Sequence, residues 1–119
     1  MSKIMVIEED GAMRMLISEW LASEGHDVCS LRRLDPAPDA TVDLVILDLP
    51  YPRSSSGETA RAVQAAHTIY PRSSVIGMST QVGRSLGGDS VVARALGVSR
   101  LLAKPCSREE MLGAVAAAF

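Results

Sequence analysis

The stretch DLVILD, residues 43–48, places four consecutive apolar residues between two carboxylates. A short continuous apolar run without polar alternation is typical of a strand that is covered on both faces of a parallel sheet. Asp48 follows this run directly. A carboxylate in such a position is costly unless it is paired, so Asp48 is the first candidate for a functional residue.

Similar runs recur on both sides of this stretch, separated by segments with helical periodicity. Between the first two runs, apolar residues are spaced so that they share one face of a helix: Met13, Leu16, Ile17, Trp20 and Leu21. Further helices are predicted over roughly residues 58–69 and 89–96, and after the capping box formed by Ser107 and Glu110. The other predicted strands are residues 4–7, 28–31, 75–78 and 101–103. Strands that alternate with helices predict an open, doubly wound α/β sheet with helices on both faces.

Two segments interrupt this alternation. Residues 32–41 contain Pro36 and Pro38 and are too few for a full helix, so the second helix is predicted to be short or missing. An exposed apolar patch would then remain near the second strand, and such patches often become interfaces. Residues 81–90 contain Gly83, Gly87 and Gly88 and indicate a mobile loop.

Composition limits the function. The 119 residues suit one domain, residues 1–119, and no apolar run approaches the ~18 residues of a membrane span. The net charge is −2, and the ten arginines are spread along the chain, which argues against direct nucleic-acid binding. Cys29 and Cys106 lie far apart without a secretion signal, so we expect a reduced, cytoplasmic protein without membrane attachment.

Chemically active side chains stand where the predicted strands end. Glu8, Glu9 and Asp10 follow the first strand, Asp48 the third, Ser79 the fourth and Lys104 the last. The carboxyl ends of parallel strands meet at one edge, which is where ligands bind in such sheets. Clustered carboxylates repel each other unless they are protonated or hold a cation, and Mg²⁺ is the natural guest. Asp10 is equally well explained as a helix N-cap.

At this point the sequence resembles the receiver domain of two-component response regulators, the CheY-like type, over essentially its whole length. Four motifs carry the resemblance: residues 4–10 with Arg14 following, residues 43–48 with Pro52 beyond, residues 75–79, and residues 101–105. The resemblance implies a flavodoxin-like sheet of five parallel strands in the order 2-1-3-4-5. It also implies a signalling function without turnover of a substrate, apart from the domain's own phosphorylation and dephosphorylation.

The resemblance assigns a role to each of the clustered residues. Asp48 would accept a phosphoryl group from a phosphohistidine of a sensor histidine kinase or phosphotransfer protein. Glu8, Glu9, Asp48 and the backbone carbonyl of Pro50 would hold Mg²⁺. Ser79 would be the hydroxyl that turns toward the phosphoryl group, and Lys104 its ionic partner. The output would be contact with a downstream protein, and pairing of two copies is left open. In this family the bond before a proline such as Pro105 is usually cis.

Several residues depart from the family pattern. The second acid of the pair is Glu9 where aspartate is usual, and Leu101 stands where an aromatic switch residue is common. Thr80 is branched where a small residue is usual, and the loop after Asp48 is one residue longer. These departures keep a second hypothesis open, a pseudo-receiver that binds partners without phosphorylation.

A third hypothesis is an unrelated nucleotide or flavin binder of the same fold class. It would need a first strand-to-helix turn rich in small residues, whose amides cradle phosphate. Here that turn reads Glu8-Glu9-Asp10-Gly11 and repels phosphate unless a cation intervenes.

Overall fold

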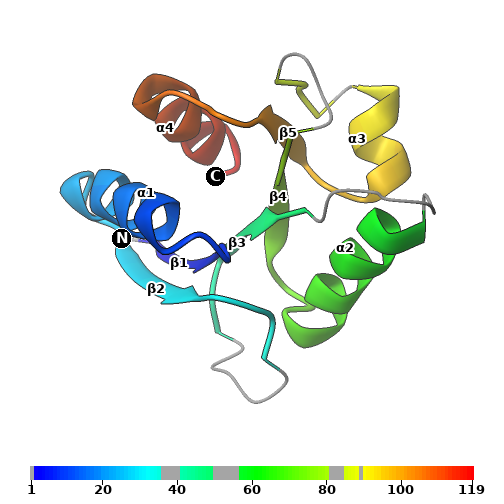
Figure 1. Cartoon of the computed structure of the whole chain (residues 1–119), viewed down its shortest axis with the longest axis horizontal. Coiled ribbons are helices and arrows are strands. Elements are labelled where there is room, and N and C mark those ends of the chain that lie inside the picture. Colours follow the sequence, from blue (N-terminus) through cyan, green and yellow to red (C-terminus); the bar gives the residue numbers. More distant parts are fainter. Residues whose placement is uncertain (1, 36–40, 50–56, 81–84, 89) are drawn as a thin grey trace.

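The computed structural model describes residues 2–35, 41–49, 57–80, 85–88 and 90–119 (Figure 1). Strands and helices alternate along them. The strands are β1 (Lys3–Ile7), β2 (Asp27–Leu31), β3 (Leu44–Asp48), β4 (Ser74–Ser79) and β5 (Arg100–Ala103). The helices are α1 (Gly11–Ser23), α2 (Gly57–Ile69), α3 (Val91–Leu96) and α4 (Arg108–Ala117). The predicted strands and helices are therefore confirmed to within a few residues.

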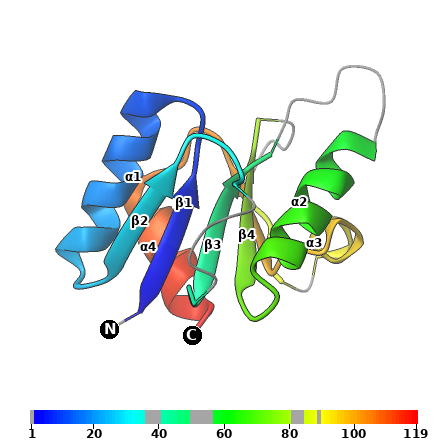
Figure 2. The same cartoon turned by 90° about the horizontal axis from the view of Figure 1, so that it is seen from below.

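All neighbouring strands are parallel, and their order is β2-β1-β3-β4-β5, as predicted. Figure 2 shows α1 and α4 on one side of the sheet and α2 and α3 on the other. In the register, Ile7 lies beside Leu47, and Asp48 beside Met78. The first turn after β1 and the ends of β3, β4 and β5 consequently meet at one edge of the sheet.

The core lies in two layers because successive strand residues point to opposite faces of the sheet. On β3, Leu44 and Ile46 pack under α1 and α4, whereas Val45 and Leu47 pack under α2 and α3. Aliphatic side chains dominate both layers, but Tyr70 is fully buried in the layer beneath α2 and α3, and Trp20 packs against the other layer. Each strand is buried on both faces only where a helix covers it, so the helices decide which part of the sheet is exposed.

The helix ends follow their capping residues. Asp10 caps α1 by accepting hydrogen bonds from the backbone N–H groups of Ala12 and Met13. Gly97 ends α3 with a left-handed backbone, φ 81°, which costs glycine little. Ser107 and Glu110 form the predicted capping box at the start of α4. Of the two roles open for Asp10, the structure therefore places it in the N-cap role.

The second crossover lacks a helix in the residues described there, 32–35 and 41–43; residues 36–40 lie outside the description. On the face that such a helix would cover, Cys29 and Leu31 of β2 are only partly buried. The sequence-based expectation of a partly uncovered sheet face near the second strand is thus confirmed for the described residues.

One sequence-based prediction needs correction. Leu16 was assigned to the apolar face of α1, but it is 41% exposed, because the buried stripe of that helix is narrower and centres on Ile17 and Leu21. In the loop that is predicted to be mobile, Leu86 forms an antiparallel bridge with Leu101 of β5, and the mobility of the loop stays a prediction. Residues 81–84 and 89 lie outside the description.

In the part of the chain that the structure describes, every helix is too short or too polar to cross a membrane.

The cap at Asp10 yields a direct test of its structural role. Asp10→Ala should lower the free energy of unfolding by ~1 kcal/mol, because two backbone donors lose their acceptor. Asp10→Ser should retain most of that stability, since a hydroxyl also caps. Urea unfolding of the three proteins measures the effect. Asp10→Ala as stable as the unmodified chain, or Asp10→Ser as unstable as Asp10→Ala, would contradict the capping role.

Candidate functional site

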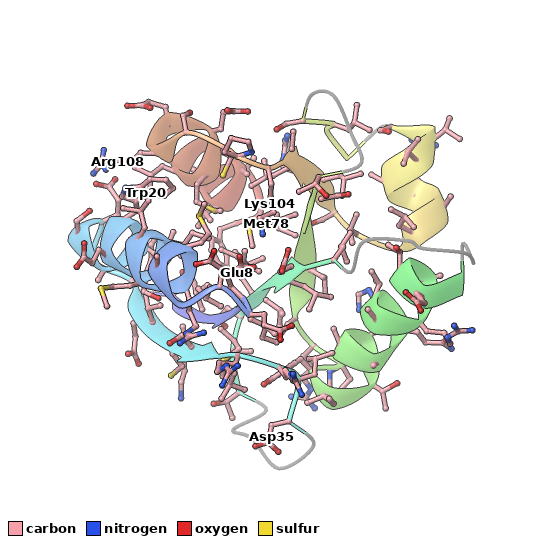
Figure 3. All side chains as sticks on the ribbon, in the orientation of Figure 1. Glu8, Trp20, Asp35, Met78, Lys104 and Arg108 are labelled. Carbon is pink, nitrogen blue, oxygen red and sulfur yellow. The ribbon has the colours of Figure 1, made fainter. Side chains whose placement is uncertain are left out.

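The site forms where β1, β3 and β5 end, and Lys104 is its centre. The ammonium Nζ of Lys104 lies 2.8 Å from Oε1 of Glu8 and 2.9 Å from Oδ1 of Asp48. Figure 3 shows Glu8 and Lys104 near the middle of the molecule. One cation therefore joins two of the predicted acids. The long stem of Lys104 spans the width of β4, which lies between β3 and β5.

Local structure fixes each of these three side chains. The backbone N–H of Glu8 donates to the carbonyl of Leu31, and its carbonyl accepts from Nη1 of Arg14 at 2.8 Å. Asp48 is the last residue of β3. The backbone N–H of Lys104 donates to the carbonyl of Ser79 at 2.9 Å, and the peptide bond from Lys104 to Pro105 is cis. The chain thus holds all three backbones at the sheet edge before any ligand arrives.

Burial differs among the three groups. Glu8 is fully buried, whereas the side chains of Asp48 and Lys104 are 25% and 17% exposed. One carboxylate oxygen of Glu8, Oε2, is buried and has no hydrogen-bond partner among the described residues. An unpartnered buried carboxylate oxygen is costly, so this position favours a proton or a cation. Asp48, by contrast, can be approached from outside.

The electrostatics of the site follow from this burial. Desolvation and the neighbouring Asp48 carboxylate together raise the pKa of Glu8 to about 7, although Lys104 opposes the shift. For Lys104, desolvation favours the neutral amine, but the hydrogen bonds to Glu8 and Asp48 outweigh it and raise the pKa of the ammonium. Lys104 is therefore a permanent cation at neutral pH, and the protonation of Glu8 changes near neutrality.

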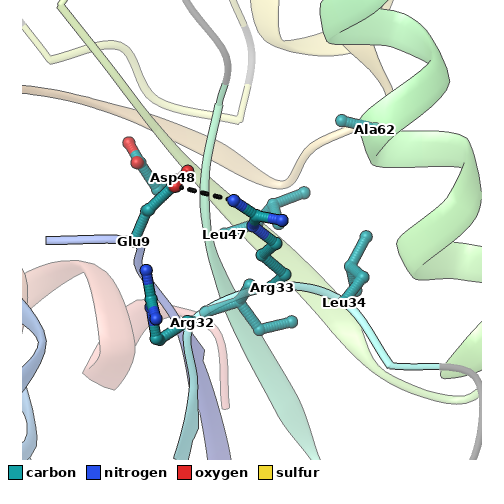
Figure 4. A pocket seen from close by; sticks show the side chains of 8 residues that line it. Glu9, Arg32, Arg33, Leu34, Leu47, Asp48 and Ala62 are labelled. Carbon is teal, nitrogen blue, oxygen red and sulfur yellow. Dashed lines mark hydrogen bonds and ion pairs between the residues drawn. The ribbon is translucent and has the colours of Figure 1, made fainter.

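Glu9 lies apart from this pair of acids. Its carboxylate Oε1 forms an ion pair with Nη2 of Arg33 at 3.2 Å, and both side chains are largely exposed. Glu9 and Asp48 nevertheless line the same cavity of about 250 Å³ at the end of β3 (Figure 4). The predicted acidic cluster is thus brought together in part: Glu8 and Asp48 share Lys104, and Glu9 stands at the cavity wall.

The remaining predicted site residues are placed as follows. Ser79 ends β4 and is buried, with 8% of its surface exposed, next to the strand that carries Asp48. Pro50, whose carbonyl is a predicted metal ligand, lies outside the described residues.

The family resemblance implies a divalent cation, so the carboxylates of the site must supply the oxygen ligands that such an ion requires. In the described ranges, no group of three or more Asp, Glu, His and Cys side chains is placed to hold a metal ion. Mg²⁺ is commonly held by only one or two carboxylates, with waters and phosphate oxygens completing its shell. Glu8, with its unpartnered oxygen, and Asp48 meet that smaller requirement, so the residues present fit the ion.

Sequence reasoning missed two residues at this site. Arg32 and Arg33 line the cavity beside Glu9 and Asp48, although neither is among the site residues predicted from the sequence. The signal was present in the sequence, because both residues directly follow the second predicted strand and so reach the same edge. With Lys104, three cationic side chains stand beside the three acids Glu8, Glu9 and Asp48.

No protein-family model matches the chain, but its sequence is similar to curated regulatory proteins. The transcriptional regulatory protein CpxR of Escherichia coli strain K12 is 29% identical over 120 residues, covering 98% of this chain and 49% of CpxR. CpxR of Klebsiella pneumoniae is equally similar. The chain thus spans about half the length of the curated relatives it matches.

Solved structures match over nearly the whole chain. A CheY-like response regulator receiver domain protein from Methanospirillum hungatei superimposes with a TM-score of 0.72 at 17% identity, covering 98% of this chain and 92% of that one. The chemotaxis response regulator CheY4 of Vibrio cholerae gives a TM-score of 0.73 at 21% identity, with 100% and 99% covered. The chain therefore has the flavodoxin-like fold of CheY-like response-regulator receiver domains.

Proposed function

We propose that this chain is a receiver domain of two-component signalling that accepts a phosphoryl group on Asp48. The observation that carries the proposal is the ammonium of Lys104, which lies within 2.9 Å of both Glu8 and Asp48. A cation beside a partly exposed carboxylate is what phosphoryl transfer to that carboxylate requires, because charge accumulates on the transferring oxygens. The donor would be a phosphohistidine of a sensor kinase or phosphotransfer protein.

In the proposed reaction, an oxygen of Asp48 attacks phosphorus and forms an O–P bond while the N–P bond of the phosphohistidine breaks. The histidine keeps the electron pair of that bond and takes up a proton. Lys104 stays with the transferred group as its ionic partner, and the hydroxyl of Ser79 turns toward it from the end of β4. The chain would therefore be modified itself without turning over a substrate.

Mg²⁺, held by Glu8 and Asp48, would neutralise charge on the transferring phosphoryl group. Glu9 would join these ligands once it leaves Arg33, and the carbonyl of Pro50 remains a predicted ligand outside the described residues. The unpartnered oxygen of Glu8 and the fit of two carboxylates support this assignment.

The proposed output is contact with a downstream protein, in a cytoplasmic setting. It would not involve direct binding to nucleic acid or a membrane by this domain, and self-association of two copies through the uncovered face near β2 is a further option. The chain spans about half the length of CpxR. Signalling by any longer protein that contains this chain is therefore also a proposal.

One observation favours the pseudo-receiver as a second candidate. Glu9 is engaged by Arg33, and Lys104 occupies both other acids, so the carboxylates are already paired with cations. A domain of this kind would bind its partner in one state, whether or not a phosphodonor is present. The next experiment separates the two candidates.

Phosphorylation of Asp48 can be measured directly. Native protein incubated with acetyl phosphate and Mg²⁺ should gain the mass of one phosphoryl group, and chelation of Mg²⁺ should abolish the gain. Asp48→Asn should gain none, because an amide is not a nucleophile toward phosphorus. Intact-mass spectrometry gives the result. No added mass on the native protein, or equal addition to Asp48→Asn, would reject the receiver function.

The protonation of Glu8 predicts how stability depends on pH without divalent ions. The folded chain keeps a proton on Glu8 up to a pH of about 7, whereas the unfolded chain releases it near 4.5. Folding therefore takes up protons between these values, and stability should fall as pH rises through them, by at most ~1.4 kcal/mol per pH unit. Urea unfolding across this range measures the slope.

The matched variants for that measurement are Glu8→Gln and Glu19→Gln. Glu8→Gln removes the titrating group and should flatten the slope, whereas Glu19 is exposed on α1, so Glu19→Gln should keep it. Identical pH dependence of the native chain and Glu8→Gln would show that folding does not change the pKa of Glu8.

A further inference from the structure

The segment that follows β2 brings two guanidinium groups to the cavity beside Asp48. β2 ends at Leu31, Arg32 and Arg33 follow it, and Leu34 packs against the core layer beneath α2 and α3. The backbone N–H of Glu8 donates to the carbonyl of Leu31, which anchors the start of this segment next to the site. The arginines therefore stand on an anchored stretch of chain, at the point where a second helix is missing from the described residues.

The cavity is lined by charged residues and by apolar residues. Its charged wall consists of Glu9, Asp48, Arg32 and Arg33, and its other lining residues are apolar ones from β1, β3, α2 and the segment after β2. Figure 4 shows the two arginine side chains reaching from the end of β2 toward Glu9 and Asp48. A volume of about 250 Å³ is enough to admit a phosphoryl group. The proposed phospho-acceptor thus opens onto a pocket with cationic groups opposite it.

The partner that Arg33 holds at present is easily exchanged. Its ion pair with Glu9 is a single contact of 3.2 Å, and the two side chains are 76% and 60% exposed. Exposed pairs of this kind contribute little to stability. A phosphoryl group offers more charge and several acceptor oxygens, which the planar fork of arginine matches in two hydrogen bonds at once.

We infer that Arg33 is a positioning residue that leaves Glu9 for the phosphoryl group at Asp48 and thereby frees Glu9 to face the divalent cation. This inference rests on the proposed function. The ligand class is a phosphoryl dianion, carried by a donor or already attached to Asp48. Arg33 acts through charge and orientation and takes no part in bond making, and Arg32 adds positive charge on the same wall.

Arg33→Ala should change two measured quantities in opposite directions. Phosphorylation by acetyl phosphate at limiting donor should slow by roughly tenfold, because a charge-assisted bidentate contact is lost. Mg²⁺ binding without donor, measured by isothermal titration calorimetry, should become tighter, because Glu9 no longer has a competing partner. Partial unfolding of the variant would lower both the phosphorylation rate and the Mg²⁺ affinity. A lower rate with a higher affinity therefore indicates a positioning role and not a loss of structure.

Three variants complete the experiment. Arg72→Ala removes an exposed arginine just after α2, at the opposite edge of the sheet, and should change neither quantity. Arg33→Lys keeps the positive charge but loses the planar guanidinium group. Its phosphorylation rate and its Mg²⁺ affinity should lie between those of the native chain and of Arg33→Ala. In a Glu9→Gln background, Arg33→Ala should no longer tighten Mg²⁺ binding, since the ion pair is already absent.

The outcomes distinguish the two proposals. Native protein that is phosphorylated on Asp48, with Arg33→Ala equal to it in rate and in Mg²⁺ affinity, overturns the role of Arg33 alone. A rate and an affinity that fall together in Arg33→Ala also overturn it. Native protein that takes up no phosphoryl group overturns the proposed function, and the role of Arg33 with it.

Discussion

The ammonium of Lys104 between the carboxylates of Glu8 and Asp48 is the contact on which the site depends. Without it, two acids would face each other at the sheet edge, and one of them, Glu8, is fully buried. Such an arrangement is unfavourable unless a positive charge compensates it. Because the cation comes from β5 and the acids from β1 and β3, the contact also ties three strand ends together. The geometry of the site therefore depends on the register of the sheet.

The second crossover contains no helix in the residues described there, 32–35 and 41–43. Its first two residues, Arg32 and Arg33, line the cavity next to Asp48, and Arg33 forms an ion pair with Glu9. The result is a site with paired charges in the absence of ligands. Under the proposed function, arrival of a cation and a phosphoryl group rearranges these pairs: Glu9 and Arg33 separate and each takes a ligand of opposite charge.

The fold could be predicted from the sequence because its determinants are local. Continuous apolar runs predicted the strands, and the Ser107–Glu110 capping box predicted the start of the last helix, both of which the structure confirms. The meeting of Asp48 and Lys104 was also predictable, since parallel strands end at one edge.

Side-chain direction could not be predicted in the same way. Glu8 and Glu9 are adjacent in the chain, yet one is buried on Lys104 and the other exposed on Arg33. Which of two neighbouring acids turns inward depends on how the chain leaves β1 and on what stands opposite. The arginine pair was overlooked because the arginines are spread along the sequence, although both residues directly follow β2 and so reach the end of the sheet that carries Glu9 and Asp48.

The role of the Glu8–Asp48 pair can be tested most directly by ¹³C NMR of the two side-chain carboxyl carbons, titrated with and without Mg²⁺. Glu8 should titrate at a pH of about 7 in the absence of Mg²⁺. Saturating Mg²⁺ should remove this step and shift both carboxyl signals. A Glu8 signal that titrates near its ordinary value of 4.5, with neither carboxyl responding to Mg²⁺, would contradict this role.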